Sequence, residues 1–129
     1  MISTNNVVRM VRVSLGLNIA VLIPVCAVLT VNVTRFVEAW GPATPARGIL
    51  LSMYLSILIL SIGLWMQRNP MLVAPLLAMQ ICYKVTTPIT VGTITNPVVI
   101  SNLAIAIVHA ITLWLVVSHH GNTTKLAHV

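Results

Sequence analysis

Four long apolar stretches, separated by short polar connections, limit what this chain can fold into. They cover residues 11–33, 48–66, 70–93 and 97–118, and each is close to the roughly 20 residues that an α-helix needs to cross a bilayer. In lipid, every backbone polar group must be satisfied within the protein, which restricts spanning segments to helices and closed barrels. Because each apolar run has the length of a helical span, we predict an all-α, integral membrane four-helix bundle with up-down topology. Residues 1–129 would form a single transmembrane domain.

The charge composition supports this class and argues against a nucleic-acid-binding protein. Only 6% of the residues are charged, whereas a soluble domain carries about 25%. The net charge of +6 comes from seven Lys and Arg against one acid, Glu38. The basic residues lie near the ends of the apolar stretches and form no basic stripe with interleaved aromatic residues, so they are typical of membrane anchoring. We expect lipids and other membrane proteins as partners, and no nucleic acid.

The distribution of basic residues predicts the orientation in the membrane. With four spans, both termini and the second connection share one side. The Lys and Arg residues of that side are Arg9, Arg12, Arg68 and Lys125, and those of the other side are Arg35 and Arg47. Because cytoplasmic loops carry the excess of basic residues, we expect both termini in the cytoplasm.

Polar residues interrupt the middle of the third stretch, where the sequence places Gln80, Tyr83, Lys84 and Thr87. A lysine at the centre of a bilayer costs about 2.5–3.5 kcal/mol on insertion scales, so it normally has a partner or a function. Pro88, four residues after Lys84, cannot donate to the Lys84 carbonyl and leaves one more acceptor at this level.

The fourth stretch carries Asn102 and His109, which we expect to meet the polar residues of the third. The short turn between these stretches predicts an antiparallel hairpin. Given a rise of 1.5 Å per residue, Lys84 would lie roughly 15 Å and His109 roughly 18 Å from that turn. We therefore predict one intramembrane patch that binds a partner or ligand. Its members are Lys84, Gln80, Tyr83, His109, Thr87 and Asn102.

Three interpretations of Lys84 remain open. It could be satisfied by a structural network within the chain. It could pair with a carboxylate or anionic lipid from outside, since Glu38 lies near the outer surface. It could be a proton or substrate site in transport.

These interpretations lead to three functional hypotheses. The favoured one is an accessory or structural subunit of a larger membrane complex. One alternative is a small homo-oligomeric transporter or channel that uses the Lys84 and His109 pair, and the other is a lipid- or quinone-binding module. The sequence contains no HExxH, GxSxG, phosphate loop or dinucleotide turn, so we expect no enzyme activity of its own. We predict no cofactor, although a bound lipid or quinone is compatible with the patch.

Two further patterns concern packing and metal binding. Small residues recur on one face of the second stretch at Gly48, Ser52, Ser56 and Gly63, a pattern that lets a neighbouring helix approach closely. Near the C-terminus, His119 and His120 could bind a metal at the membrane edge. The favoured interpretation of residues 119–129 is a polar, mobile tail without a metal.

The spacing Pro75-x4-Gln80-x2-Tyr83-Lys84 resembles a segment of small uncharacterised bacterial membrane proteins with about four helices. The resemblance covers ten residues. It implies the same topology and a role for Gln80, Tyr83 and Lys84. It implies no particular activity, because none is assigned to those proteins. Separately, we expect a bacterial inner membrane as the location.

Overall fold

The computed structural model describes residues 3–31 and 37–126, and the side chains of all of these except 37, 38 and 122–126. It confirms the all-α class. The helices are α1 (Thr4–Val31), α2 (Val37–Trp40), α3 (Pro45–Trp65), the 3-10 helix η2 (Pro70–Val73), α4 (Ala74–Val91) and α5 (Pro97–Leu126). Four segments are long and apolar enough to cross a membrane, namely Thr4–Val31, Pro45–Trp65, Pro70–Val91 and Pro97–Gly121.

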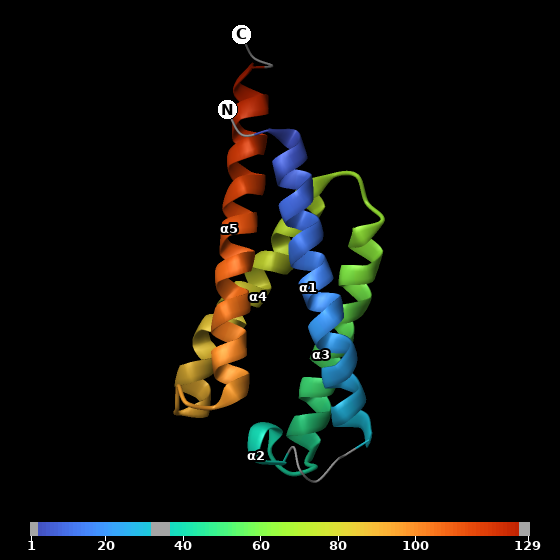
Figure 1. Cartoon of the computed structure of the whole chain (residues 1–129), viewed down its shortest axis with the longest axis vertical. Helices are drawn as coiled ribbons and strands as arrows, with labels where there is room; N and C mark the ends of the chain where they lie inside the picture. The colour runs from blue at the N-terminus through green and yellow to red at the C-terminus, as the bar shows by residue number, and fades with distance from the viewer. Residues whose placement is uncertain (1–2, 32–36, 127–129) are drawn as a thin grey trace.

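The long helices alternate in direction, so both termini lie at one end of the bundle (Figure 1). They are arranged as two antiparallel pairs, α1 with α3 and α4 with α5, and contacts between α1 and α5 join the pairs. By contrast α3 and α4, which follow one another in the chain, make few contacts. The bundle is therefore less closed along the α3–α4 seam than a symmetric four-helix bundle would be.

Local sequence signals explain where the central helices begin and end. The Thr44 hydroxyl accepts a hydrogen bond from the Arg47 backbone N–H at 3.4 Å, and Pro45 occupies the first turn of α3. The Asn69 side chain caps η2 by accepting from the Met71 N–H at 3.0 Å. Side-chain caps of this kind satisfy N–H groups that have no partner within the helix.

Gly92 ends α4 in the left-handed conformation, with φ 76°, and its N–H donates to the Pro88 carbonyl at 3.0 Å. We expect Gly92→Ala to lower the free energy of unfolding by about 1–2 kcal/mol, because a Cβ is strained in this conformation. Denaturation with SDS from mild-detergent micelles measures this value. The matched control is Gly63→Ala, in the last turn of α3, where an added Cβ meets no atom within 4 Å. It should be neutral or stabilising by up to about 1 kcal/mol through helix propensity. Equal losses in both variants would contradict the assignment of the effect to the backbone.

The helices extend beyond the apolar stretches at both ends of the chain. α1 begins at Thr4, before the apolar run that starts near residue 11, and α5 continues to Leu126. Residues 119–126 are therefore helical, the mobility expected of this tail stays a prediction, and residues 127–129 lie outside the described part. A helix tolerates Gly121 because an internal glycine costs only about 1 kcal/mol relative to alanine.

The small-residue face of α3 points away from the rest of the bundle. Gly48, Ser52, Ser56 and Gly63 are all exposed. The Ser52 and Ser56 hydroxyls donate to the carbonyls one turn earlier, at 3.3 and 2.9 Å. The buried face of α3 is instead formed by Tyr54, Ile57 and Ser61, with Arg47 at the start of the helix. No helix of the described part packs on the small residues, and packing by another protein stays a prediction.

Candidate functional site

The interior of the bundle contains polar side chains beside the apolar ones. They come from all four long helices, at depths where lipid offers no hydrogen bonds. Apart from Arg47, the buried polar residues are Ser14, Asn18, Ser61, Gln80, Lys84, Asn102, His109 and Thr112. Each of them must be satisfied by the protein or by something bound to it.

His109 is the centre of the first group, and its side chain is 0% exposed. Its Nε2 lies 3.0 Å from the Asn18 Oδ1 and 3.2 Å from the Gln80 Oε1. Since an amide oxygen only accepts, this ring nitrogen carries a hydrogen. The other ring nitrogen, Nδ1, lies 3.2 Å from the Ser14 Oγ.

Two further hydroxyls complete this group, which we call the His109 cluster: Ser14, Asn18, Ser61, Gln80, His109 and Thr112. The Asn18 Nδ2 donates to the Ser61 Oγ at 3.1 Å. The Ser14 and Thr112 hydroxyl oxygens are 2.8 Å apart. The cluster therefore joins α1, α4 and α5 at the histidine ring, and it joins α3 through the hydrogen bond between Asn18 and Ser61.

The hydroxyls of the His109 cluster can serve either protonation state of the ring. With a neutral ring, Thr112 donates to Ser14 and Ser14 donates to Nδ1. With a protonated ring, Nδ1 donates to Ser14, Ser14 donates to Thr112, and Thr112 donates to the Val108 carbonyl at 2.9 Å. A hydroxyl rotates to suit its partners, so the same side chains accommodate both directions.

Lys84 and Asn102 form the second group, which with Tyr83 and Thr87 we call the Lys84 cluster. The Lys84 Nζ donates to the Asn102 Oδ1 at 3.0 Å, and the Asn102 Nδ2 donates to the Thr87 Oγ1 at 3.4 Å. The ammonium also lies 4.9 Å from the centroid of the Tyr83 ring, a distance suited to a cation–π interaction. Lys84 is only 4% exposed.

Each of the six predicted site residues belongs to one of these two clusters. Gln80 joins His109, whereas Lys84 joins Asn102, Thr87 and Tyr83. No hydrogen bond joins the two clusters within residues 3–31 and 37–126, so the residues predicted as one patch form two hydrogen-bonded groups, and their role in binding a partner or ligand stays a prediction. The use of Lys84 and His109 as a transport pair stays a prediction. The Glu38 side chain, considered above as a partner for Lys84, lies outside the described side chains.

Sequence analysis missed the contributions of α1 and α3 to the site. Ser14 and Asn18 are four residues apart and so share a helix face, a signal that could have identified them. Thr112 lies three residues after His109 and has the same kind of signal. Ser61 gave none, because a lone serine in an apolar helix does not indicate which face is buried.

Two cavities adjoin the Lys84 cluster, and both are bordered by Trp40, Tyr54 and Asn102. The first, which we call the Lys84 cavity, has a volume of about 280 Å³ and is lined by α1 and α5 as well as by Lys84. The second, the Tyr83 cavity, has a volume of about 390 Å³ and lies between α3 and the α4–α5 pair. The short helix α2, which carries Trp40, lies at this end of the bundle, opposite the termini (Figure 1).

Trp40 and Tyr54 contact each other between the helix pairs, with ring centroids 5.8 Å apart and an interplanar angle of 84°. This edge-to-face arrangement is a favourable one for aromatic rings. The contact places rigid aromatic walls beside both cavities. It also connects α2 to α3, and Arg47 strengthens this end by donating to the Gly41 and Leu29 carbonyls at 2.9 and 3.4 Å.

Two buried polar atoms have no partner among the described residues: the Tyr83 hydroxyl and the Gln80 Nε2. A buried donor without an acceptor costs about 1–3 kcal/mol. Tyr83 lines the Tyr83 cavity, and a bound molecule with an acceptor oxygen would relieve this cost there.

Metal binding receives no support from the described residues. They contain no group of three or more His, Cys, Asp or Glu that could hold an ion. His119, one of the two metal candidates, has its Nε2 3.1 Å from the Thr4 Oγ1, which links α5 to the start of α1. His120 also interacts with a neighbouring group.

Comparison of the chain with protein-family models, with curated proteins and with solved structures finds no match. The resemblance of the Pro75–Lys84 segment to small bacterial membrane proteins therefore stays a prediction. Function must be inferred from the site itself.

Proposed function

We propose that this chain is a membrane-embedded binding protein for an amphiphilic molecule of the lipid or quinone class. One observation carries the proposal: the Lys84 ammonium lines a largely apolar cavity, and Asn102 is its only hydrogen-bond acceptor among the described residues. An ammonium has three N–H donors, so a neutral amide oxygen satisfies it only in part. An anionic or carbonyl oxygen in the cavity would supply the missing acceptor.

The shape and lining of the Lys84 cavity support this proposal. Its volume, about 280 Å³, is near the lower end of the range typical of small-molecule sites, which are mostly apolar with a few convergent polar groups. Leu22, Val25, Val98 and Ile105 form apolar walls, while Lys84, Asn102 and Tyr54 supply the polar groups. The polar head of an amphiphile would contact Lys84 and its apolar tail would lie along these walls.

Trp40 provides a reporter for the test, since it borders both cavities. With Trp65 and Trp114 replaced by Phe, titration of the purified protein with decylubiquinone, and separately with oleate, should quench or shift Trp40 fluorescence. We expect Lys84→Met to weaken binding of at least one probe about 10- to 100-fold, because a hydrogen bond to a charged group contributes about 1.5–3 kcal/mol. Methionine preserves the length of the side chain, so the cavity keeps its shape.

The matched control is Ile89→Met, on the lipid-facing side of α4, where the side chain is 81% exposed. This variant also introduces a methionine into α4, at a position that lines neither cavity. The affinity for decylubiquinone and for oleate should therefore not change. If neither probe binds, or if Lys84→Met binds both as tightly as the parent, the proposal is wrong.

An accessory-subunit role is the second candidate function. The observation that favours it is the outward position of Gly48, Ser52, Ser56 and Gly63, which leaves a face for close helix packing without a partner in the described chain. Native mass spectrometry after extraction in mild detergent tests this role. A well-behaved monomer without co-purifying proteins would count against it.

For the location, we propose a bacterial inner membrane with both termini in the cytoplasm. The excess of Arg and Lys on the side of the termini supports the orientation. A cysteine-accessibility or reporter-fusion assay at the two termini tests it, and periplasmic termini would contradict it.

A further inference from the structure

A separate pocket lies at the end of the bundle that carries both termini, and it shares no lining residue with the Lys84 cavity. It has a volume of about 380 Å³ and lies between α1 and the turn that follows α3. Its lining includes Arg12, Arg68 and Trp65 over an apolar floor of Val8, Val11 and Leu15. We call it the arginine pocket. The Lys84 cluster and its cavities contribute no residue to it.

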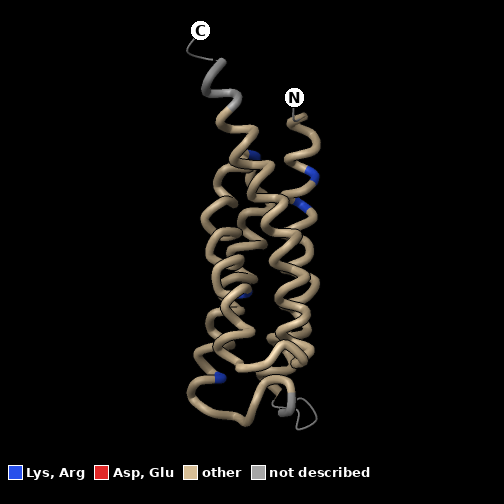
Figure 2. Tube along the Cα trace, turned by 90° about the vertical axis from the view of Figure 1, so that its left-hand side faces the viewer, with Lys and Arg blue, Asp and Glu red and all other residues tan. Residues whose placement is uncertain are grey.

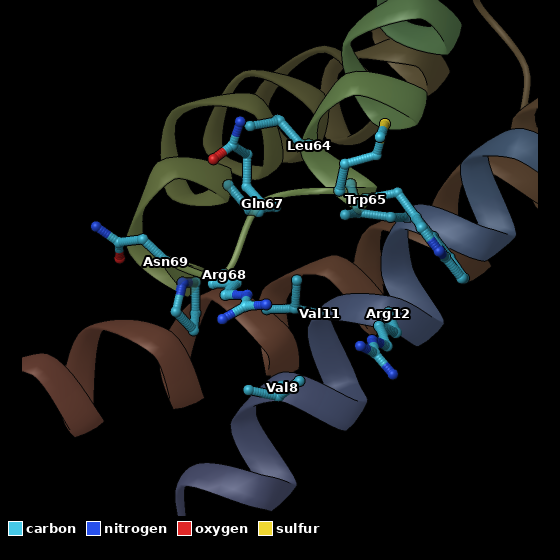
Figure 3. Close-up of a pocket in the computed structure, with 12 residues that line it drawn as sticks. Val8, Val11, Arg12, Leu64, Trp65, Gln67, Arg68 and Asn69 are labelled. Atoms are coloured by element: carbon cyan, nitrogen blue, oxygen red, sulfur yellow. The ribbon is translucent and has the colours of Figure 1, made fainter.

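The two arginines reach the arginine pocket from different elements. Arg12 extends from α1 and Arg68 from the turn after α3, and the side chains of Val8 and Val11 lie between them (Figure 3). Trp65 lies along α1, where a Cβ added to Gly16 would come within 3.1 Å of its ring. The indole therefore packs closely on α1 beside Arg12 and forms a fixed wall.

Positive charge at this end is not offset by acidic side chains. Arg9 lines an adjoining pocket together with Arg12 and Trp65. The basic residues of the described part gather mainly at the end with the termini (Figure 2). The one acid of the chain, Glu38, belongs to the connection before α3, at the opposite end. An anion in the arginine pocket would therefore meet two guanidinium groups without competition from a carboxylate.

We propose that the arginine pocket binds the phosphate of an anionic phospholipid, with an acyl chain against the apolar floor. Guanidinium groups suit phosphate because they can donate two parallel hydrogen bonds. A tryptophan at the headgroup level is typical of membrane interfaces, and basic pockets between spans recognise anionic headgroups. The proposal is independent of the Lys84 cavity, because it concerns a different pocket, at the other end of the bundle, that shares no lining residue with that cavity.

The test is native mass spectrometry of the full chain, titrated in detergent micelles with phosphatidylglycerol or with phosphatidylcholine. We expect tighter binding of phosphatidylglycerol. Arg12→Gln and Arg68→Gln should each weaken it about fivefold, given the usual contribution of one basic residue at a membrane surface. The double variant should weaken it about 25-fold if the two contributions add.

Arg9→Gln is the matched control, because it removes the same charge at the same end without altering the lining of the arginine pocket. It should change the affinity less than twofold. A loss equal to that of Arg12→Gln would show diffuse surface attraction and overturn the proposal. Equal affinity for the two lipids, or for inorganic phosphate and phosphatidylglycerol, would overturn it as well. The exposed positions of Arg12 and Arg68 make loss of folding unexpected. If the double Gln variant does not fold, the test uses the single Gln variants. It also uses an Arg12→Lys/Arg68→Lys variant, which keeps the charge.

Discussion

Replacing His109 with leucine is expected to lower the free energy of unfolding by about 3 kcal/mol, one of the two largest effects among the substitutions considered. The side chain is completely buried, and its ring is hydrogen-bonded to Ser14, Asn18 and Gln80. Leucine has a similar size but offers none of these bonds. It would leave polar groups on α1 and α4 without partners where water cannot replace the ring.

The measurement is SDS denaturation from mild-detergent micelles, followed by circular dichroism. Ile107→Leu, at a lipid-facing position of α5 that is 63% exposed, is the control and should change stability by no more than about 0.5 kcal/mol. A loss for His109→Leu as small as that of the control would show that the His109 cluster does not hold the two helix pairs together.

Asn102→Leu is expected to have a comparable effect, a loss of about 3 kcal/mol, because it removes the acceptor of a buried ammonium. The Lys84 Nζ donates to the Asn102 Oδ1 at 3.0 Å, and the described part of the chain offers no other acceptor to it. Leucine cannot accept a hydrogen bond, so the charge would remain in an apolar site. Ala104→Leu, on the exposed side of the same helix, should be nearly neutral.

A double variant distinguishes the loss of the ammonium's hydrogen-bond acceptor from a loss of side-chain packing. In the Lys84→Met/Asn102→Leu double variant both polar partners are replaced by apolar side chains, which is often neutral or stabilising for buried charged groups. We therefore expect the double variant to recover to within about 1 kcal/mol of the parent. If the double variant instead loses as much free energy of unfolding as the single variants Lys84→Met and Asn102→Leu lose together, the effect of Asn102→Leu comes from packing. The Lys84–Asn102 hydrogen bond is then not its cause.

The fold was largely predictable because its main determinant is local. Each apolar stretch must cross the bilayer as a helix, and the short turn at Asn96 and Pro97 leaves no alternative to an antiparallel hairpin. The helix ends were less predictable. α5 continues to Leu126, past residue 118, where the apolar stretch ends, because no proline stops the helix there.

The candidate site was predictable only in part. The matching depths of Lys84 and of the polar residues on the fourth stretch correctly placed the third and fourth spans together, and Lys84 does contact Asn102. The choice between Asn102 and His109 as its partner depends on how far the two helices are rotated about their axes. Residue depth carries no information on that rotation, so the division into two clusters could not be foreseen.

The amino-acid sequence by itself determined that this is a membrane protein with four helical spans, and that charged and polar groups lie inside the membrane. Both conclusions follow from the lengths of the apolar stretches, their hydropathy and the spacing of residues along the sequence. Only the tertiary structure decided that α1 satisfies His109 through Ser14 and Asn18, that Ser61 of α3 accepts from Asn18, and that α3 and α4 stay apart. It also decided that Lys84 borders a cavity. The physical reason is that lipid solvates every apolar helix face about equally, so polar contacts and close packing between helices select the arrangement.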